Sequence, residues 1–318
     1  MPRHATLIFN PVAGQRDPDR DLDLICQSLR SQFELDIVYT TEEIGADKRA
    51  EEAIEAGAEM VIASGGDGTL SKAAKALLET EIPLGVISRG TANAFATALG
   101  IPAGITAACE TILAGETRVV DAARCNGEPM VLLAGIGFEA EAVDRVGRGM
   151  KDRFGMLAYL ISGLRQLRSF DRFAVEITTE TKTVRTRAAA VTVANAAPPT
   201  SILAQGPPKV ASDDGLLDIT IVASETMAEA ISDAYSLLRS ALEDDPVDRP
   251  HIGYLRAKRV KVTTDPPQKV VVDGDMRGET PIEFECVPKA LTIFTPKARA
   301  NQRTESLEGL PDLEVIED

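Results

Sequence analysis

The sequence predicts a doubly wound parallel α/β domain followed by an antiparallel β-sandwich domain. Short apolar strands alternate with helices over residues 1–122, and short strands dominate the chain after that. Three strands of the first part also end in turns that contain glycine. Alternating strands and helices are typical of parallel sheets, and closely spaced strands are typical of sandwiches. We expect domains at 1–122 and 123–300, with 288–300 packing back on the first, and an acidic, mobile tail at 301–318.

The first domain is expected to consist of strand–helix pairs. Helical spacing is clear at Leu22, Ile25, Leu29 and Phe33, and Gly57 is a typical residue to follow a helix end. The expected strands are 5–9, 35–40, 59–64 and 83–88, and the expected helices are 21–33, 47–57, 70–80 and 91–101.

The second domain shows strand patterns and hairpin turns. Asn126-Gly127 separates two apolar runs, which predicts a hairpin. Residues 172–196 read as two β-rich runs joined by a polar turn. Further strands are expected at 215–224, 259–264, 269–275, 281–288 and 290–296, with helices at 155–167 and 227–242.

Composition excludes several classes of protein. The net charge is −15, from 49 acidic and 34 basic residues, so the surface repels nucleic acid. The four cysteines do not pair in zinc spacing with each other or with the two histidines. No secretory signal and no run of 18 apolar residues is present, so we expect a cytoplasmic protein without a transmembrane segment.

The stretch "VIASGGDGTL" at 61–70 indicates a phosphate site. A strand, a glycine turn and a helix present backbone N–H groups to an anion, and glycine lets a phosphate approach the backbone. Thr69 is a candidate for capping the helix or binding a phosphate. Asp67 would repel a phosphate unless a divalent cation lies between them, which suggests a nucleotide bound with Mg²⁺. The alternative is a tight turn in which Asp67 is only a cap.

Two further turns have the same layout. "PLGVISRGTANAFA" at 83–96 is again strand, Gly-Thr turn and helix, and "FNPVAG" follows the first strand. Turns at the carboxyl ends of parallel strands flank one crevice, where open α/β sheets bind ligands. The dinucleotide pattern G-x-G-x-x-G and the Walker A pattern are both missing.

Taken in order, "NPVAG", "GGDGTL", "GVISRGTANAFA", "DDGLLDI" and a late "DGD" resemble the diacylglycerol kinase catalytic-domain superfamily, in particular its bacterial soluble lipid kinases. Sphingosine and ceramide kinases share the core motifs. The resemblance covers about residues 5–296. The motif G-G-D-G-T alone also occurs in NAD kinases and phosphofructokinase relatives. The resemblance implies an α/β nucleotide domain, a β-sandwich and an active site between them.

The resemblance assigns residues to ATP and Mg²⁺. For ATP it implies Asn10, Gly14, Thr41, Gly65, Gly66, Asp67, Gly68, Thr69, Gly90 and Thr91. For a structural Mg²⁺ site it implies the Asp214 carboxylate, with backbone carbonyls near Ala211 and Leu216. Asp275 stands where the family has a general base, and Asp67 is the second catalytic carboxylate. From the residues alone, "VVVDGDMRGE" is also a plain hairpin, and "DDGLLDI" is also a loop that enters a strand.

The sequence departs from the family pattern at three places. Ala94 replaces an Asp that helps to organise the Mg²⁺ site, Ser71-Lys72 replaces Asn-Glu, and Asp275 replaces the usual Glu.

Two features bear on a lipid acceptor. Ile202 and Leu203 are candidates for an apolar channel or for a plain surface loop, and a basic cluster could meet anionic headgroups or be a solvated loop. This cluster comprises Arg145, Arg148, Lys151 and Arg153.

The leading hypothesis is an ATP-dependent lipid kinase that phosphorylates a hydroxyl of diacylglycerol or a related lipid. One alternative is another small-molecule kinase, NAD kinase above all, and a second is a non-catalytic regulator that binds nucleotide or lipid. The expected partner is a lipid at the membrane surface, so the protein would be cytoplasmic and peripheral. Nucleic acid is not expected as a partner, and an exposed strand edge would permit a homodimer.

Overall fold

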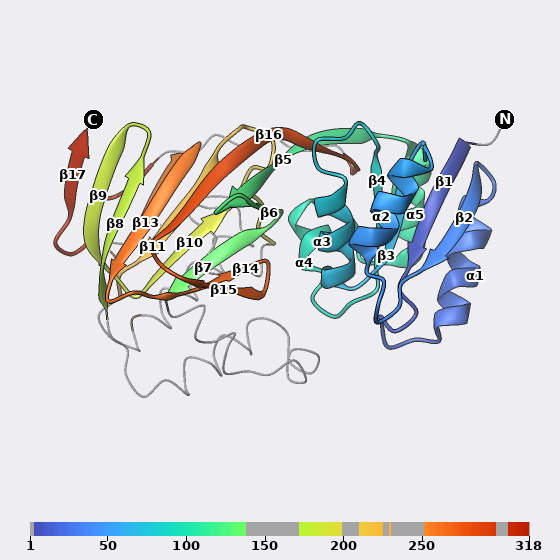
Figure 1. Cartoon of the computed structure of the whole chain (residues 1–318), viewed down its shortest axis with the longest axis horizontal. Coiled ribbons are helices and arrows are strands. Elements are labelled where there is room, and N and C mark those ends of the chain that lie inside the picture. Colours follow the sequence, from blue (N-terminus) through green and yellow to red (C-terminus); the bar gives the residue numbers. More distant parts are fainter. Residues whose placement is uncertain are drawn as a thin grey trace. The chain divides into compact units, whose positions relative to one another are not determined.

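A computed structural model describes residues 3–137, 172–198, 210–224, 229, 251–296 and 305–317 (Figure 1). The chain divides into two compact units. Unit 1 comprises Met1–Ala122 and Pro288–Arg299, and unit 2 comprises Ala123–Val287 and Ala300–Asp318. Some sequence predictions lie outside the described residues. These are the helices at 155–167 and 227–242 (apart from residue 229), Ile202 and Leu203, and the basic cluster at 145–153.

Unit 1 is a parallel sheet with helices. Its strands run in the order β2-β1-β3-β4, and the end of β16 joins β4 where Ile293 pairs with Leu84. The elements are β1 (Arg3–Phe9), α1 (Pro18–Leu29), β2 (Phe33–Tyr39), α2 (Ala46–Glu55), β3 (Val61–Gly65), α3 (Asp67–Ala76), β4 (Leu84–Ser88), α4 (Ala94–Ala98) and α5 (Ile105–Ala114).

The helices of unit 1 form two layers. Helices α1 and α5 contact each other and share a core cluster with Leu7 and Phe9 of β1 and Ile62 of β3. Helices α2 and α3 contact each other instead, with α3 against β3 and β4. Neighbouring residues of a strand point to opposite faces, so both faces of β1 and β3 are buried. The predicted doubly wound parallel arrangement is confirmed.

Two helices of unit 1 differ from the sequence prediction. Helix α5 was not predicted, although Ile105, Cys109 and Ile112 have helical spacing, and Gly115 ends the helix at φ 71°. The helix expected at 91–101 is shortened to α4, because Asn93 takes the left-handed conformation at φ 49° and the helix starts only after it. Residues 89–93 therefore stay in the turn after β4.

Unit 2 is a sandwich of two antiparallel sheets. One sheet has the order β17-β9-β8-β13-β16 and the other β12-β11-β10-β7-β14-β15. Its strands are β5 (Thr117–Cys125, begun in unit 1), β6 (Glu128–Met130), β7 (Leu133–Gly137), β8 (Phe173–Thr179), β9 (Lys182–Ala188), β10 (Ala190–Ala194), β11 (Leu217–Val222), β12 (Ile252–Ala257), β13 (Arg259–Asp265), β14 (Lys269–Val272), β15 (Asp275–Glu279), β16 (Ile282–Phe294, ended in unit 1) and β17 (Glu314–Glu317).

The core of unit 2 lies between its two sheets. Val175 and Val262 from one sheet and Val193 and Ile219 from the other belong to one cluster of buried side chains. The alternation of buried and exposed residues in β9 and β13 gives each strand an inner and an outer face. The predicted antiparallel sandwich is confirmed, as is the hairpin at Asn126-Gly127, where Cys125 pairs with Glu128.

The acidic tail differs from the expectation of a mobile segment. Glu314–Glu317 form β17, which pairs antiparallel with β9, and Lys182 Nζ lies 2.6 Å from Glu305 Oε2. Leu310 is buried in the unit 2 core and lies over Gly253. The described part of the tail, 305–317, thus pairs with the edge of β9 that β8 leaves open and places Leu310 in the core. Among the helices that the structure describes, none has the length and apolar character needed to cross a membrane.

Candidate active site

Three turns meet at the carboxyl ends of β1, β3 and β4. In the turn after β1, the Asn10 side-chain Nδ2 donates to Thr69 Oγ1 at 2.8 Å, and the Asn10 backbone N donates to the Ser64 carbonyl at 2.9 Å. The turn after β4 is joined to the same loop, because the Arg89 backbone N donates to the Gly65 carbonyl at 2.7 Å. The turns expected to flank one crevice are therefore in contact.

The glycines of these turns are needed for two different reasons. A Cβ on Gly90 would lie 3.1 Å from the Gly66 Cα, and Gly14 has φ +93° with the Arg89 carbonyl 3.0 Å from a Cβ position. These glycines let one turn pack against another. Gly68, in contrast, has no atom within 4 Å of its Cβ position, so it leaves open space in front of the first turn of α3. That is the place where a ligand can approach the backbone.

Asp67 is the first residue of α3 and binds the start of α4. Its Oδ1 accepts a hydrogen bond of 3.0 Å from the Phe95 backbone N. Burial raises the pKa of Asp67, and the nearby N–H groups of Phe95, Ala94 and Asn93 oppose that shift. The carboxylate thus caps a helix whose own preceding residue, Asn93, makes no side-chain cap. This matches the alternative in which Asp67 is a cap, although it caps α4 and not α3.

Thr69 binds a residue of another turn, and Thr41 binds residues of its own loop. Thr69 is buried and its hydroxyl accepts from Asn10, while α3 begins after Gly66 without a side-chain cap. Thr41 follows β2 on the surface, and its hydroxyl donates to Glu43 Oε2 at 2.9 Å and accepts from the Ile44 N at 3.1 Å. Thr69 organises the turns, and Thr41 organises the loop before α2.

A cavity of about 350 Å³ opens beside the turns. Gly14, Arg16, Gly90, Thr91 and Asn93 are among the residues that line it. Three buried polar atoms near these strand ends have no hydrogen-bond partner among the described residues, namely Ser64 Oγ, Ser88 Oγ and Asn93 Oδ1. Of these three residues, Ser88 and Asn93 line the cavity and Ser64 does not. The glycine turns with their backbone N–H groups beside this cavity are the feature that fits a phosphate group.

The expected Mg²⁺ site around Asp214 contains an arginine. Asp214 is ion-paired with Arg256, and its Oδ1 accepts from the Leu216 backbone N at 3.2 Å. The Arg256 Nε also lies 3.5 Å from Asp218 Oδ1, and Tyr254 donates to the same oxygen. Burial alone would lower the pKa of Arg256, but the charges of Asp218 and Asp214 outweigh it and the pKa is raised. The guanidinium balances these carboxylates, so the residues do not fit a metal ion there unless Arg256 moves.

Asp275 begins β15 directly after a hairpin turn. Asp273 and Gly274 have positive φ values of 51° and 90°, and Val272 pairs with Asp275 across the turn. The Asp275 side chain is exposed. The turn itself is fixed by Asp273, whose carboxylate accepts from the backbone N atoms of Val131, Leu132 and Leu133 at 2.9–3.2 Å. The sequence predicts a turn at Asp273-Gly274 that holds Asp275, because an Asp before Gly is a known turn signal, but it does not show which backbone groups the Asp273 carboxylate binds.

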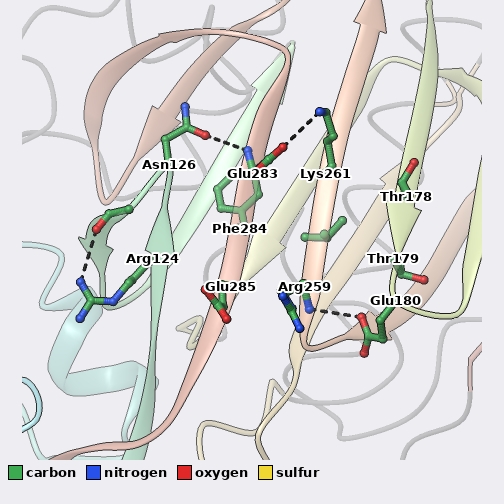
Figure 2. Close-up of a pocket in the computed structure, with 12 residues that line it drawn as sticks. Arg124, Asn126, Thr178, Thr179, Glu180, Arg259, Lys261, Glu283, Phe284 and Glu285 are labelled. Carbon is green, nitrogen blue, oxygen red and sulfur yellow. Dashed lines mark hydrogen bonds and ion pairs between the residues drawn. The ribbon is translucent and has the colours of Figure 1, made fainter.

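A larger cavity, of about 480 Å³, lies on the outer face of unit 2 (Figure 2). Several of its polar residues already have partners. Lys261 Nζ lies 3.1 Å from Glu283 Oε1, and Glu180 accepts from the backbone N atoms of Lys258 and Arg259. It has no cluster of glycine turns and no buried unpaired polar side chain, so the smaller cavity is the better candidate for a reactive site.

Two family models together match most of the chain. The model of the diacylglycerol kinase catalytic domain matches residues 4–125. The model of the YegS C-terminal NAD kinase beta sandwich-like domain matches residues 133–295. A diacylglycerol kinase of Bacillus subtilis is 31% identical over 306 residues, which are 94% of this chain and 99% of that protein. The chain belongs to the diacylglycerol kinase family.

A further relative and a solved structure are similar to this diacylglycerol kinase family member over most of its length. Protein sll0036 of Synechocystis sp. is 48% identical over 301 residues, which cover 91% of this chain and 70% of that protein. A solved structure of a candidate diacylglycerol kinase from Bacillus anthracis has a TM-score of 0.78 and 29% identity, and it covers 92% of this chain and 95% of its own. The resemblance inferred from the motifs is confirmed.

The structure places two of the departures from the family pattern. Ala94 is the first residue of α4, and its backbone N, which does not depend on the side chain, opposes the raised pKa of Asp67. Lys72 is exposed on α3, and its Nζ lies 3.5 Å from the Cβ position of Gly45. Lys72 therefore faces the surface beside the loop before α2.

Proposed function

We propose that this chain transfers the γ-phosphoryl group of ATP to a hydroxyl of diacylglycerol or a related lipid. The observation that carries the proposal is the cluster of three glycine turns beside a cavity that Gly14, Gly90 and Thr91 line, in a chain of this family. The acceptor oxygen forms the new P–O bond, the bond between the γ-phosphorus and the bridging oxygen breaks, and ADP leaves. The hydroxyl proton passes to a base.

The residues of the three turns have complementary roles in this proposal. Backbone N–H groups around Gly66, Gly68 and Gly90 bind phosphate oxygens, and Asn10, Gly14, Thr69 and Thr91 complete the nucleotide site with Thr41 and Gly65. Magnesium bound to ATP takes one or two protein carboxylates, and Asp67 is the carboxylate of these turns. A metal ion bound there would supply charge neutralisation for the phosphates.

Asp275 is the proposed general base for the lipid hydroxyl. It is exposed and held on a hairpin that Asp273 anchors by hydrogen bonds, so its backbone position is well defined. Because the acceptor is a lipid, the encounter takes place at a membrane surface. Asp275 is one methylene shorter than the Glu that the family resemblance implies, and a displacement of about 1 Å can cost about 100-fold in rate.

The deciding experiment incubates the protein with labelled ATP, Mg²⁺ and a total lipid extract, followed by purified diacylglycerol, ceramide and sphingosine. We expect label in one lipid class.

We expect Asp275→Asn and Asp67→Asn each to lower kcat by about 100-fold or more, as losses of a proton acceptor and of a positioned charge do. Glu279→Gln, at the far end of the same exposed strand, is the control and should keep its activity.

Two outcomes would replace the proposal. When NAD is added to the same assay, label in NAD and in no lipid would assign the chain to small-molecule phosphorylation, in line with the NAD kinase-like description of its second domain. Nucleotide binding without turnover, unchanged by Asp275→Asn in a cellular assay, would identify a regulator.

A further inference from the structure

Arg89 lies in the turn after β4, but its side chain points into the protein. The side chain is 1% exposed, although Arg89 is among the residues that line the cavity beside the turns, together with Gly90 and Thr91. Arginine is among the residues least often buried, unless it is paired. A buried arginine inside a phosphate-type turn therefore needs a specific explanation.

All side-chain partners of Arg89 belong to the turn after β1 or its two flanks. Nε donates to Asp21 Oδ2 at 2.9 Å, Nη1 donates to the Asn10 carbonyl at 2.9 Å, and Nη2 donates to the Ala13 carbonyl at 2.7 Å. The guanidinium carbon lies 4.2 Å from the centre of the Phe9 ring. One side chain thus binds the end of β1, the turn and α1 together.

This arrangement separates Arg89 from a phosphate-binding arginine. An arginine that binds phosphate offers its planar guanidinium to two oxygens of the ligand. Here Asp21, itself buried, neutralises the guanidinium, and backbone carbonyls occupy two further donors. To reach a ligand, Arg89 would have to leave Asp21 uncompensated in the interior, which is strongly unfavourable.

We propose that Arg89 is a positioning residue, which holds the turn 10–16 in place so that Asn10 and Gly14 can bind the nucleotide. The backbone of Arg89 also packs directly against this turn, because a Cβ added to Gly14 would lie 3.0 Å from the Arg89 carbonyl oxygen. Its role in ATP binding rests on the proposed function. Its role in holding the turn rests on geometry alone, so the two can be tested separately.

The first test is amide hydrogen exchange without nucleotide on Arg89→Met and on Arg20→Met. Arg20 is the matched control, because it lies on α1 with its side chain 87% exposed. We expect exchange at 12–16 to accelerate tenfold or more in Arg89→Met only, with α2 unchanged in both proteins. Unchanged exchange at 12–16 in folded Arg89→Met would overturn the proposal.

A second variant covers the case in which Arg89→Met does not fold. Arg89→Met combined with Asp21→Leu removes both buried charges and replaces the pair by apolar side chains, which buried pairs often tolerate. The same acceleration at 12–16 is expected. Arg89→Lys keeps the charge but loses the fork of donors, so we expect it to lie between the wild type and Arg89→Met.

The second test separates positioning from general destabilisation. We expect the KM for ATP to rise tenfold or more in Arg89→Met and in the double variant, while the KM for the lipid changes less than twofold. A rise in lipid KM with unchanged ATP KM would contradict the role in nucleotide binding. If the wild type transfers no phosphate to any lipid, the proposed function fails, and the exchange experiment still decides whether Arg89 holds the turn.

Discussion

At the scale of single residues, Asp67 shows how a catalytic candidate can also be a structural one. Its carboxylate is partly buried, accepts from the Phe95 N and has a raised pKa. A sequence motif shows that a carboxylate is present in the glycine turn, but it does not show which backbone groups the carboxylate meets. The ionised form of Asp67 is therefore held at some cost to stability, which is common at functional sites.

We expect Asp67→Asn to make stability less dependent on pH. The pKa of Asp67 is higher in the folded protein than in the unfolded chain. As pH rises from about 4, the carboxyl group therefore ionises first in the unfolded chain, and the wild type loses stability until the pH passes the pKa of the folded protein. Asparagine keeps an acceptor for the Phe95 N and does not ionise. Urea unfolding at pH 4 to 8 measures this. A wild type that gains stability relative to Asp67→Asn over this range would contradict the expectation.

The burial of the four cysteines is a second feature at the scale of single residues. All four are free and buried, and burial raises the pKa of Cys109 to about 11. The thiolate is the reactive form, so at pH 8 only about one Cys109 in a thousand would be ionised even if reagent could enter. We expect no thiol to react with a thiol reagent at pH 8 in the folded protein, and all four to react in urea. Rapid labelling of the folded chain would be evidence against this burial.

At the scale of elements, the C-terminal strand β17 covers the edge of a sheet. Glu314–Glu317 pair with β9, so the edge of β9 that could have paired with a second copy is covered by the chain itself. A homodimer stays a prediction. If it forms, its interface is not the edge of β9 that β17 covers.

The tail should contribute to stability mainly through one side chain. Leu310 is 6% exposed and belongs to the unit 2 core, whereas Leu313, three residues on, is 36% exposed. We expect Leu310→Ala to lower the free energy of unfolding by about 2 kcal/mol, because it leaves a cavity over Gly253. Leu313→Ala is the control and should change it by less than about 0.5 kcal/mol. Equal effects of the two changes in chemical denaturation would argue against a docked tail.

At the scale of the whole molecule, the two compact units carry separate sets of proposed functional residues. The glycine turns belong to unit 1, and the hairpin with Asp275 belongs to unit 2. The net charge of −15 gives no long-range attraction toward anionic lipid, so recognition of a membrane lipid has to depend on local features.

The cysteines report on each unit, because Cys26 and Cys109 lie in unit 1 and Cys125 and Cys286 lie in unit 2. We expect ATP to protect the first pair from thiol reagents in moderate urea more than the second pair. At 100 times its Kd, a ligand stabilises its site by about 2.7 kcal/mol. Mass spectrometry of the labelled peptides distinguishes the pairs. Equal protection of all four cysteines would show that the chain unfolds as one unit, and no protection would speak against nucleotide binding in unit 1.

The sequence by itself determined most of the elements and the family of this protein, although it missed α5 and the strand β17. Strand–helix alternation, the glycine turns and the Asn-Gly and Asp-Gly hairpins depend on local backbone preferences, which each short segment carries. The tertiary structure decided which groups meet. Phe95 meets Asp67 across 28 residues, Asp21 meets Arg89 across 68, and Arg256 meets Asp214 across 42. Such partners depend on how the strands and helices pack together and on which charged groups lose contact with water on burial. Local sequence patterns therefore do not specify them.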